Sequence, residues 1–239
     1  MWMAVCLVGA LSMGFVSCGG DDEDENKKPE VENPNSNTGG GEEPGGNNPG
    51  GKPAGDNSPS WVKAVDLGLS VKWASGNVGA NSEADYGDYF SWGEVATKSL
   101  YNQNTYKMWD LSKSSWVDIG HDIYGTDHDV AHVRWGGTWR MPLASEFREL
   151  IEKCTVQETT VGGVKVVRFT AANGNSIVLP EAGYREGGNV ERGAVQCCYW
   201  SSSASMAGSP YLLMASKDAD VVVWGALAFR GLTIRPVTE

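Results

Sequence analysis

The polar side chains best suited to bind a metal ion are concentrated between residues 121 and 132. This segment contains all three histidines of the protein and three carboxylates: His121, Asp122, Asp127, His128, Asp129 and His132. His128 and His132 are four residues apart, a spacing that would align two imidazoles on one helix face for a metal. No third ligand follows at a familiar spacing, the EF-hand pattern is missing, and Gly120 and Gly125 are typical of a loop. We therefore expect a structural hydrogen-bonding network and no bound metal, with His128, His132 and Asp129 as the candidate ligands if one binds.

The cysteines offer a second kind of chemistry. Three of them lie beyond the N-terminal region: Cys154, Cys197 and Cys198. An odd number cannot form a complete set of disulfides within one chain. Cys154 lies on an apolar helical pattern and is expected in the core, whereas Cys197 and Cys198 point to opposite faces if their segment is a strand. A catalytic thiol needs an electropositive neighbourhood, and only Arg192 is near them in sequence.

Other catalytic signals are weak. Ser201–Ser203 could supply a nucleophile, but no base can be assigned to it, so a structural role is favoured. The sequence contains no phosphate-binding loop and no GxGxxG, HExxH or GxSxG motif. We predict no catalytic residues, no cofactor and no enzymatic activity.

The elements that must position these side chains begin at Trp61, where the composition changes to aromatic and β-branched residues. One amphipathic helix is predicted over about 145–154, because Phe147, Leu150, Ile151 and Cys154 recur at helical spacing after a plausible N-cap at Ser145. Residues 96–128 are polar and lack periodicity, which indicates a long loop. A strand and a turn are expected within 64–78, and strands over 164–170, 176–179, 198–201, 211–215, 220–224 and 232–237, with Asn173-Gly174 as a hairpin turn. Core positions are predicted for Trp73, Trp92, Trp135 and Trp139. One helix among short antiparallel strands predicts an α+β domain.

Most of the acidity lies outside this domain. The net charge is −11, of which residues 19–60 carry ten acidic and three basic side chains, and residues 61–239 carry twenty and sixteen. Residues 19–60 also contain ten glycines and six prolines with almost no apolar side chains, which predicts a disordered tether. No basic patch is present, which argues against a nucleic-acid partner.

The N-terminal segment has the pattern of an export signal. Met1–Ser17 is uncharged and apolar, too short for a comfortable membrane span, and ends in small residues. Residues 15–18 resemble a bacterial lipobox, and the acidic run after Cys18 resembles that of Bacteroidota lipoproteins carried to the cell surface. We expect a signal peptide over 1–17, a lipidated Cys18 followed by a linker over 18–60, and one domain over 61–239. The alternative is a plain secretory signal with an incidental cysteine.

Motifs along the whole domain resemble one family. They are AVDLGLSVKWASGNVGA, DYGDYFSWGE, DVAHVRWGGTWRMP, NGNSIVLPEAGYREG, YWSSS and GLTIRPV, with the expected helix after the third. In this order they resemble the Fibrobacter-major-paralogous-type domain of Bacteroidota surface proteins, which is related to the C-type-lectin-like fold of formylglycine-generating enzymes and of retroelement-diversified proteins. The resemblance implies that the first strand pairs with the last and that ligands bind an irregular, strand-poor surface. Leu143 stands where the family has a Thr cap, and residues 221–230 are more apolar than in the family.

The C-terminal part of the domain contains the candidate binding residues. Between Gln196 and Arg230, family-like positions alternate with atypical side chains, which predicts an exposed apolar surface for a ligand. The candidates are Gln196, Ser205, Met206, Leu213, Val222, Trp224, Leu227 and Phe229. A buried hairpin is the alternative.

Together these patterns predict a lipoprotein anchored in the outer membrane and facing the cell exterior. Its domain would recognise an extracellular glycan or protein non-covalently through the C-terminal surface, with that surface diversified by a retroelement as a further hypothesis. The alternatives are a structural, adhesin or fimbria-associated component of the envelope and, third, a formylglycine-generating-like enzyme.

Overall fold

The computed structural model describes residues 55–191, 195–206, 208–216 and 221–239, and for residues 195, 196 and 216 it describes the backbone alone. All of these residues belong to one compact unit, Asn48–Glu239. The predicted signal peptide, Cys18 and nearly all of the linker lie outside the described residues. Within the described residues, no helix is long and apolar enough to cross a membrane.

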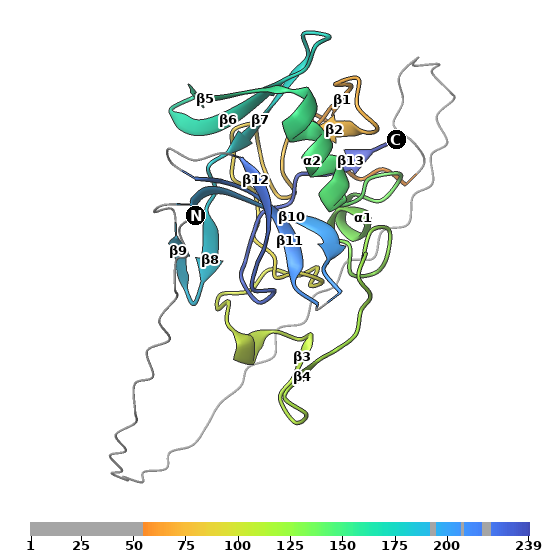
Figure 1. Ribbon diagram of the computed structural model, residues 1–239, viewed down its shortest axis with the longest axis vertical. Helices are drawn as coiled ribbons and strands as arrows, with labels where there is room; N and C mark the ends of the chain where they lie inside the picture. The colour runs from red at the N-terminus through yellow and green to blue at the C-terminus, as the bar shows by residue number, and fades with distance from the viewer. Residues whose placement is uncertain (1–54, 192–194, 207, 217–220) are drawn as a thin grey trace, which may run out of the picture. The chain divides into compact units, whose positions relative to one another are not determined.

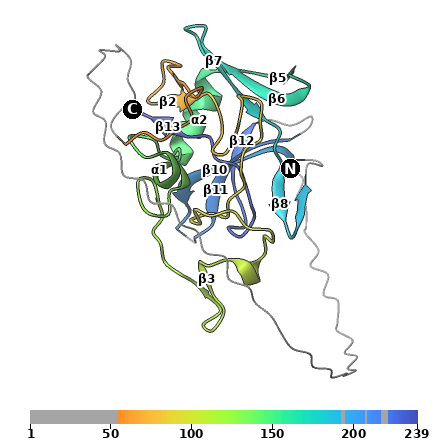
Figure 2. The ribbon, with the colours of Figure 1, turned by 180° about the vertical axis from the view of Figure 1, so that it is seen from behind.

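The described chain is rich in β-structure, with few helices and small antiparallel sheets (Figure 1). A central sheet contains β10 (Val195–Ala204), β11 (Pro210–Ser216) and β12 (Val222–Gly225) in that order. Another sheet contains β5 (Thr155–Val161), β6 (Val164–Thr170) and β7 (Ser176–Pro180). Two hairpins contain β3 (Trp109–Asp110) with β4 (Ser115–Trp116), and β8 (Tyr184–Glu186) with β9 (Asn189–Glu191). In both views the β5–β7 sheet and the β3–β4 hairpin lie at opposite ends of the folded unit, with β10–β12 between them (Figure 2).

The predicted hairpin between β6 and β7 is confirmed. Phe169 pairs with Ile177, and Gly174 in the connecting turn has a φ of 85°, which glycine adopts without strain. β5 adds a third strand that was not predicted, because its side chains are polar or exposed on both faces.

The predicted helix is present as α2 (Ala144–Lys153), but its start differs from the prediction. The N-cap is Leu143 and not Ser145, which is exposed within the first turn. Glu146 compensates from inside the helix, because its Oε2 accepts a hydrogen bond from the Leu143 N–H at 2.7 Å. Its carboxylate also forms paired bonds of 2.9 and 2.6 Å to Arg140. The start of the helix is thus stabilised by an acceptor one turn later.

A second α-helix follows the loop expected over 96–128 and corrects the expectation that the segment containing His132 is not helical. α1 (Val130–Trp135) is short, and a 3₁₀ turn, η1 (Gln103–Thr105), lies within the predicted loop. The Asp129 carboxylate caps α1 by accepting from the N–H groups of Ala131 at 2.9 Å and His132 at 3.0 Å. Because the nearby glycines favour a loop, the sequence alone did not predict that Asp129 caps a helix.

The C-terminal strand pairs with the region expected to form the first strand, as the resemblance implies. β13 (Val237–Thr238) pairs with β2 (Lys72–Ala74), and β1 (Ala64–Val65) lies on the other side of β2. The strand expected over 232–237 is reduced to isolated bridges before β13. Arg235 is fully buried within it, where its Nε donates to Asn77 Oδ1 at 2.8 Å.

The central sheet lies between two core clusters, and side chains alternate between them along β10 and β11. Cys197, Tyr199 and Leu213 enter one cluster, whereas Cys198, Trp200 and Leu212 enter the other. The prediction that Cys197 and Cys198 point to opposite faces is therefore confirmed. Core positions are also confirmed for the predicted residues Trp73, Trp92, Trp135, Trp139 and Cys154.

Candidate functional site

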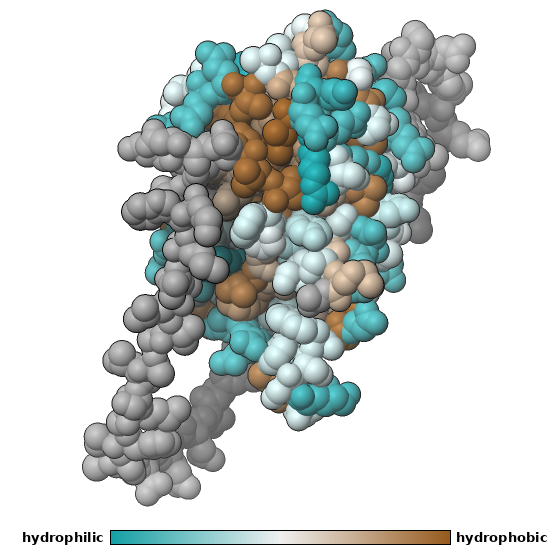
Figure 3. Space-filling view, viewed as in Figure 1, coloured by the Kyte–Doolittle hydropathy of each residue, from teal (hydrophilic) through white to brown (hydrophobic). Residues whose placement is uncertain are grey.

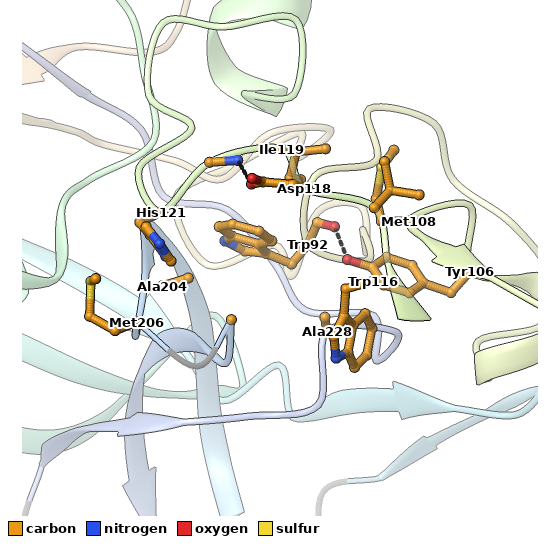
Figure 4. Close-up of a pocket in the computed structure, with 13 residues that line it drawn as sticks. Trp92, Tyr106, Met108, Trp116, Asp118, Ile119, His121, Ala204, Met206 and Ala228 are labelled. Carbon is orange, nitrogen blue, oxygen red and sulfur yellow. Dashed lines mark hydrogen bonds between the residues drawn. The ribbon is translucent and has the colours of Figure 1, made fainter. Parts of the chain in front are cut away.

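An aromatic pocket of about 200 Å³ opens beside the end of β10 (Figure 4). Its walls come from distant parts of the chain: Trp92 and the segment 106–121, then Ala204, Met206 and Gly208, and Ala228. The lining side chains are mainly apolar, namely Trp92, Tyr106, Met108, Trp116, Ile119 and Met206. We refer to this feature as the aromatic pocket.

Two buried aromatic rings form its floor. Tyr106 donates its hydroxyl hydrogen to the Trp92 carbonyl at 2.8 Å, and Trp92 Nε1 donates to the Ser201 carbonyl at 3.0 Å. Burial raises the pKa of Tyr106, with the nearby Glu94 carboxylate adding to the shift. The floor is thus neutral and rigid, and its hydrogen-bonding groups are already used inside the protein.

Trp116 forms the exposed wall. It lies on β4, 47% exposed, and meets the rings of Tyr106 and Trp109 edge to face at 5.9 and 4.7 Å. Trp109 is also its cross-strand partner in the β3–β4 hairpin. The two contacts hold the indole beside the pocket while leaving nearly half of it open to solvent.

The rim is held by pairing between residues 118–123 and the end of β10. Ala204 donates its N–H to the His121 carbonyl at 2.6 Å, and His121 Nδ1 lies 3.1 Å from the Ser205 carbonyl. Asp118 Oδ1 accepts from the Gly120 N–H at 3.0 Å. In Figure 4, His121 and Met206 lie on one side of Trp92, and Tyr106 and Met108 on the other.

Gly93 allows this rim to approach the floor. A Cβ at this position would collide with Cδ1 of Ile119, and the φ of Gly93 is +77°, in the left-handed region. The left-handed backbone conformation favours glycine there, and any larger residue would also have to displace the end of the Ile119 side chain.

The predicted binding residues are partly brought together. Met206 lines the aromatic pocket and is 87% exposed. Ser205 lies next to it, and Leu227 (47% exposed) and the half-buried Phe229 flank the lining residue Ala228.

The other candidates do not line this pocket. Trp224 is 66% exposed on the outer strand β12, and Val222 is half-buried on the same strand. Leu213 is a wrong candidate, because strand alternation places it fully buried in the core beneath α2. Gln196 lies in β10, and its side chain is outside the described residues.

Apolar surface also gathers where β12 passes beside α2, on the face shown in Figure 3. Ile151, Val221 and Val223 are half-buried there and pack on the core cluster that contains Leu213. These three side chains contribute to the packing over that cluster, and none of them lines the aromatic pocket.

The sequence reading missed most of the pocket. Tyr106, Met108, Trp116, Ile119 and His121 all belong to the segment classed as a long polar loop or to the candidate metal cluster. A usable signal was present, since large apolar side chains in a polar, aperiodic loop must find a partner or remain exposed.

Asp129, one of the three candidate metal ligands, is the centre of a hydrogen-bonding network. Besides capping α1, its carboxylate accepts from the N–H groups of Met141 at 3.0 Å and Gly125 at 2.9 Å. His128 Nδ1 lies 2.9 Å from the Gly93 carbonyl, and His128 does not line the aromatic pocket. Across the described ranges, no three His, Cys, Asp or Glu side chains lie together as a metal site would require.

The cysteines and serines also have structural partners. Cys197 Sγ lies 3.6 Å from the carbonyls of Leu179 and Pro180, and burial raises its pKa well above the ordinary value. Burial raises the pKa of Cys198 to about 12, although Arg230 opposes the shift. Ser201 Oγ donates to the Tyr211 carbonyl at 2.8 Å, and Ser202 Oγ to the Pro142 carbonyl at 3.2 Å. Neither thiol is placed to supply a thiolate.

The chain matches no known protein family, no curated protein and no solved structure. The function must therefore be argued from the geometry of the aromatic pocket.

Proposed function

We propose that this chain is a cell-surface lipoprotein whose folded domain recognises an extracellular glycan or protein non-covalently at the aromatic pocket. The observation that carries the proposal is the exposure of Trp116 and Met206 beside a rigid, buried floor. Exposed aromatic and methionine side chains around a concavity are typical of binding sites. The pocket overlaps the C-terminal surface that the sequence indicates, through Met206 and the segment around Ala228.

The lectin-like fold is part of this proposal. The joining of the chain's first strands to β13 and the long irregular segment that carries the pocket are consistent with it. Retroelement diversification of residues 194–237 is a further hypothesis about the same surface. A near-copy of those codons beside a reverse transcriptase gene, differing at adenine positions, is expected; its absence would remove this hypothesis and leave the binding proposal.

The binding proposal is tested with the full chain displayed on cells, using glycan arrays and cross-linking to extracellular proteins. We expect a saturable ligand whose binding is lost in Met206→Glu and retained in Trp224→Ala. Met206 is suited to this test because its exposure on a turn means that the substitution leaves the core intact. Isolation of the chain only in stoichiometric envelope assemblies would instead favour the structural, adhesin or fimbria-associated role. Covalent turnover of a bound peptide would favour the formylglycine-generating-like enzyme.

The anchor is tested separately through Cys18. Labelling with a fatty-acid analogue should mark the wild-type chain and not Cys18→Ala. Each buried methylene contributes about 0.8 kcal/mol, so a multiply acylated cysteine holds the chain on the membrane. Membrane retention of the unlabelled variant after a salt wash would contradict the lipid anchor.

A further inference from the structure

The size of the aromatic pocket limits its occupant. Its volume is about 200 Å³, below the range of roughly 300–1,000 Å³ found for pockets that enclose whole drug-sized ligands. The space suits one side chain or one sugar ring. A choice between these depends on the polar groups that face the space.

The polar groups of the buried floor are committed to the protein itself, whereas the Asp118 carboxylate at the rim faces solvent. The Tyr106 hydroxyl and Trp92 Nε1 both donate to backbone carbonyls, and His121 Nδ1 is within hydrogen-bond distance of the Ser205 carbonyl. A sugar ring needs several directed hydrogen bonds to replace those it makes with water, because unpaired polar groups are costly when buried. An apolar side chain needs none. The hydrogen bonding of the pocket therefore favours the side chain.

The two methionines in the walls support the same occupant. Met108 is half-buried on one side of the floor and Met206 is 87% exposed on the other. Methionine is flexible and polarisable, so it can close over apolar groups of different shapes and contact aromatic rings. Such walls suit a protein anchor, which contributes most of the binding energy of an interface from a few large side chains.

The negative charge at the rim of the pocket favours a cationic residue of the ligand beside its apolar side chain. Asp118 lines the pocket, is exposed, and forms no ion pair with any residue in the described part of the chain. Asp122 is also exposed, four residues further along the same segment. A cation on the ligand would meet uncompensated negative charge here, and such complementarity contributes mainly to specificity and association rate.

We propose that the aromatic pocket receives one large apolar side chain of a protein ligand, beside a lysine or arginine of that ligand that faces Asp118. This inference rests on the proposed function and selects a protein over a glycan. It assigns the apolar contact to Trp116 and Met206 and the charge contact to Asp118.

The test uses the full chain in lipid nanodiscs and a series of short acetylated peptides, measured by surface plasmon resonance. The peptides have the sequence Gly-Lys-X-Lys-Gly, in which X is Phe, Leu or Ala, with a matched Gly-Glu-X-Glu-Gly series. We expect X = Phe to bind at least about tenfold more tightly than X = Ala, a difference of about 1.4 kcal/mol. The lysine series should bind more tightly than the glutamate series, and this preference should weaken as salt is raised.

Matched variants separate the two contacts. Trp116→Ala and Met206→Glu should each remove the preference for Phe, whereas Trp224→Ala, which removes an exposed indole outside the pocket, should not. Asp118→Asn should remove the preference for lysine and keep that for Phe, because asparagine Oδ1 can still accept from Gly120. Thermal unfolding verifies that each variant is folded, and the exposed Met206 keeps the test decisive if Trp116→Ala does not fold.

Equal binding of the Phe and Ala peptides, or no peptide binding, would overturn the inference. Binding measurements with a panel of methyl glycosides distinguish failure of this inference from failure of the proposed function. Glycoside binding that Met206→Glu abolishes would overturn the side-chain proposal and support non-covalent recognition at the pocket. Peptide binding that survives Met206→Glu and Trp116→Ala but not Trp224→Ala would move the site to β12 and overturn both assignments.

Discussion

Asp129 connects two segments of the fold through one buried carboxylate. Its oxygens accept from N–H groups of α1 and of Met141, so the substitution Asp129→Asn would place an amide NH₂ against donors. We expect this substitution to lower the free energy of unfolding by about 3 kcal/mol, which is the upper end of the range for hydrogen bonds to a charged group. Urea denaturation measures the effect. Asp127→Asn, at an exposed position two residues earlier, is the control and should change it by no more than about 0.5 kcal/mol.

The buried thiol of Cys198 makes the free energy of unfolding decrease at alkaline pH. Burial raises its pKa from an ordinary 9.0 to about 12. Between these values the unfolded thiol loses its proton and the folded thiol keeps it, so stability is full below pH 9 and declines as the pH rises. The contribution is about 1.4 kcal/mol per pH unit for one thiol. The unfolding free energy of Cys198→Ala, measured from pH 9 to 11, should decline less steeply than that of the wild type by this amount; parallel slopes would contradict the assignment.

Sequence patterns predict the environment of a side chain where that environment depends on residues nearby in the sequence. Strand alternation was enough to place Cys197 and Cys198 in different core clusters. It could not show that Leu213 is covered, because that depends on α2, which lies about sixty residues earlier in the chain. Burial at one position is a property of every element packed on it.

The first turn of α2 lacks a side-chain acceptor at its N-cap. Leu143 has the extended backbone of a cap, with φ −70° and ψ 155°, but no oxygen to accept from the free N–H groups. Leu143→Thr should supply one. We expect the unfolding free energy of Leu143→Thr to exceed that of Leu143→Val by about 1 kcal/mol, because valine has the same shape without the hydroxyl. Thermal denaturation of the two variants gives the comparison, and equal stability would mean that the added hydroxyl forms no capping bond.

Elements with strong internal periodicity were predictable, and the pocket was not. α2 and the β6–β7 hairpin each follow from one stretch of sequence, through helical spacing and a turn signal. The pocket is formed by pairing over long separations: Trp92 Nε1 reaches the carbonyl of Ser201, 109 residues away. No pattern within residues 96–128 encodes that partner, so a segment without periodicity was assigned as a loop although it carries most of the site.

Most of the net negative charge of the chain lies outside the folded part that carries the aromatic pocket. Of the net charge of −11, residues 19–60 carry −7 (ten acidic minus three basic), so the folded part is only mildly acidic. The exposed carboxylates of Asp118 and Asp122 at the pocket rim are therefore local features and not a consequence of general acidity. Raised salt should accordingly weaken the binding of lysine peptides without changing the apolar contact of Trp116.

Closure of the folded unit depends on its last residues. Val237 is fully buried, pairs with Trp73 of β2, and exchanges backbone hydrogen bonds of 2.9 and 3.0 Å with Arg140. It thus joins the start, middle and end of the domain. Deleting residues 237–239 removes a buried valine, worth about 2 kcal/mol, and backbone bonds worth about 1 kcal/mol each. We expect a loss of about 4 kcal/mol, a large share of the ~5–15 kcal/mol that holds a domain folded.

Urea denaturation of the truncated chain tests this closure. Deletion of Glu239 alone is the control, because that residue is exposed and its carbonyl accepts only from Lys72 Nζ at 2.9 Å. The control should leave the urea midpoint near that of the wild type, while the longer deletion lowers it without changing the binding-pocket residues. If both deletions have the wild-type midpoint, β13 does not stabilise the domain. If the longer deletion also abolishes ligand binding in a chain that remains folded, the pocket depends on the sheet that the two ends of the domain share.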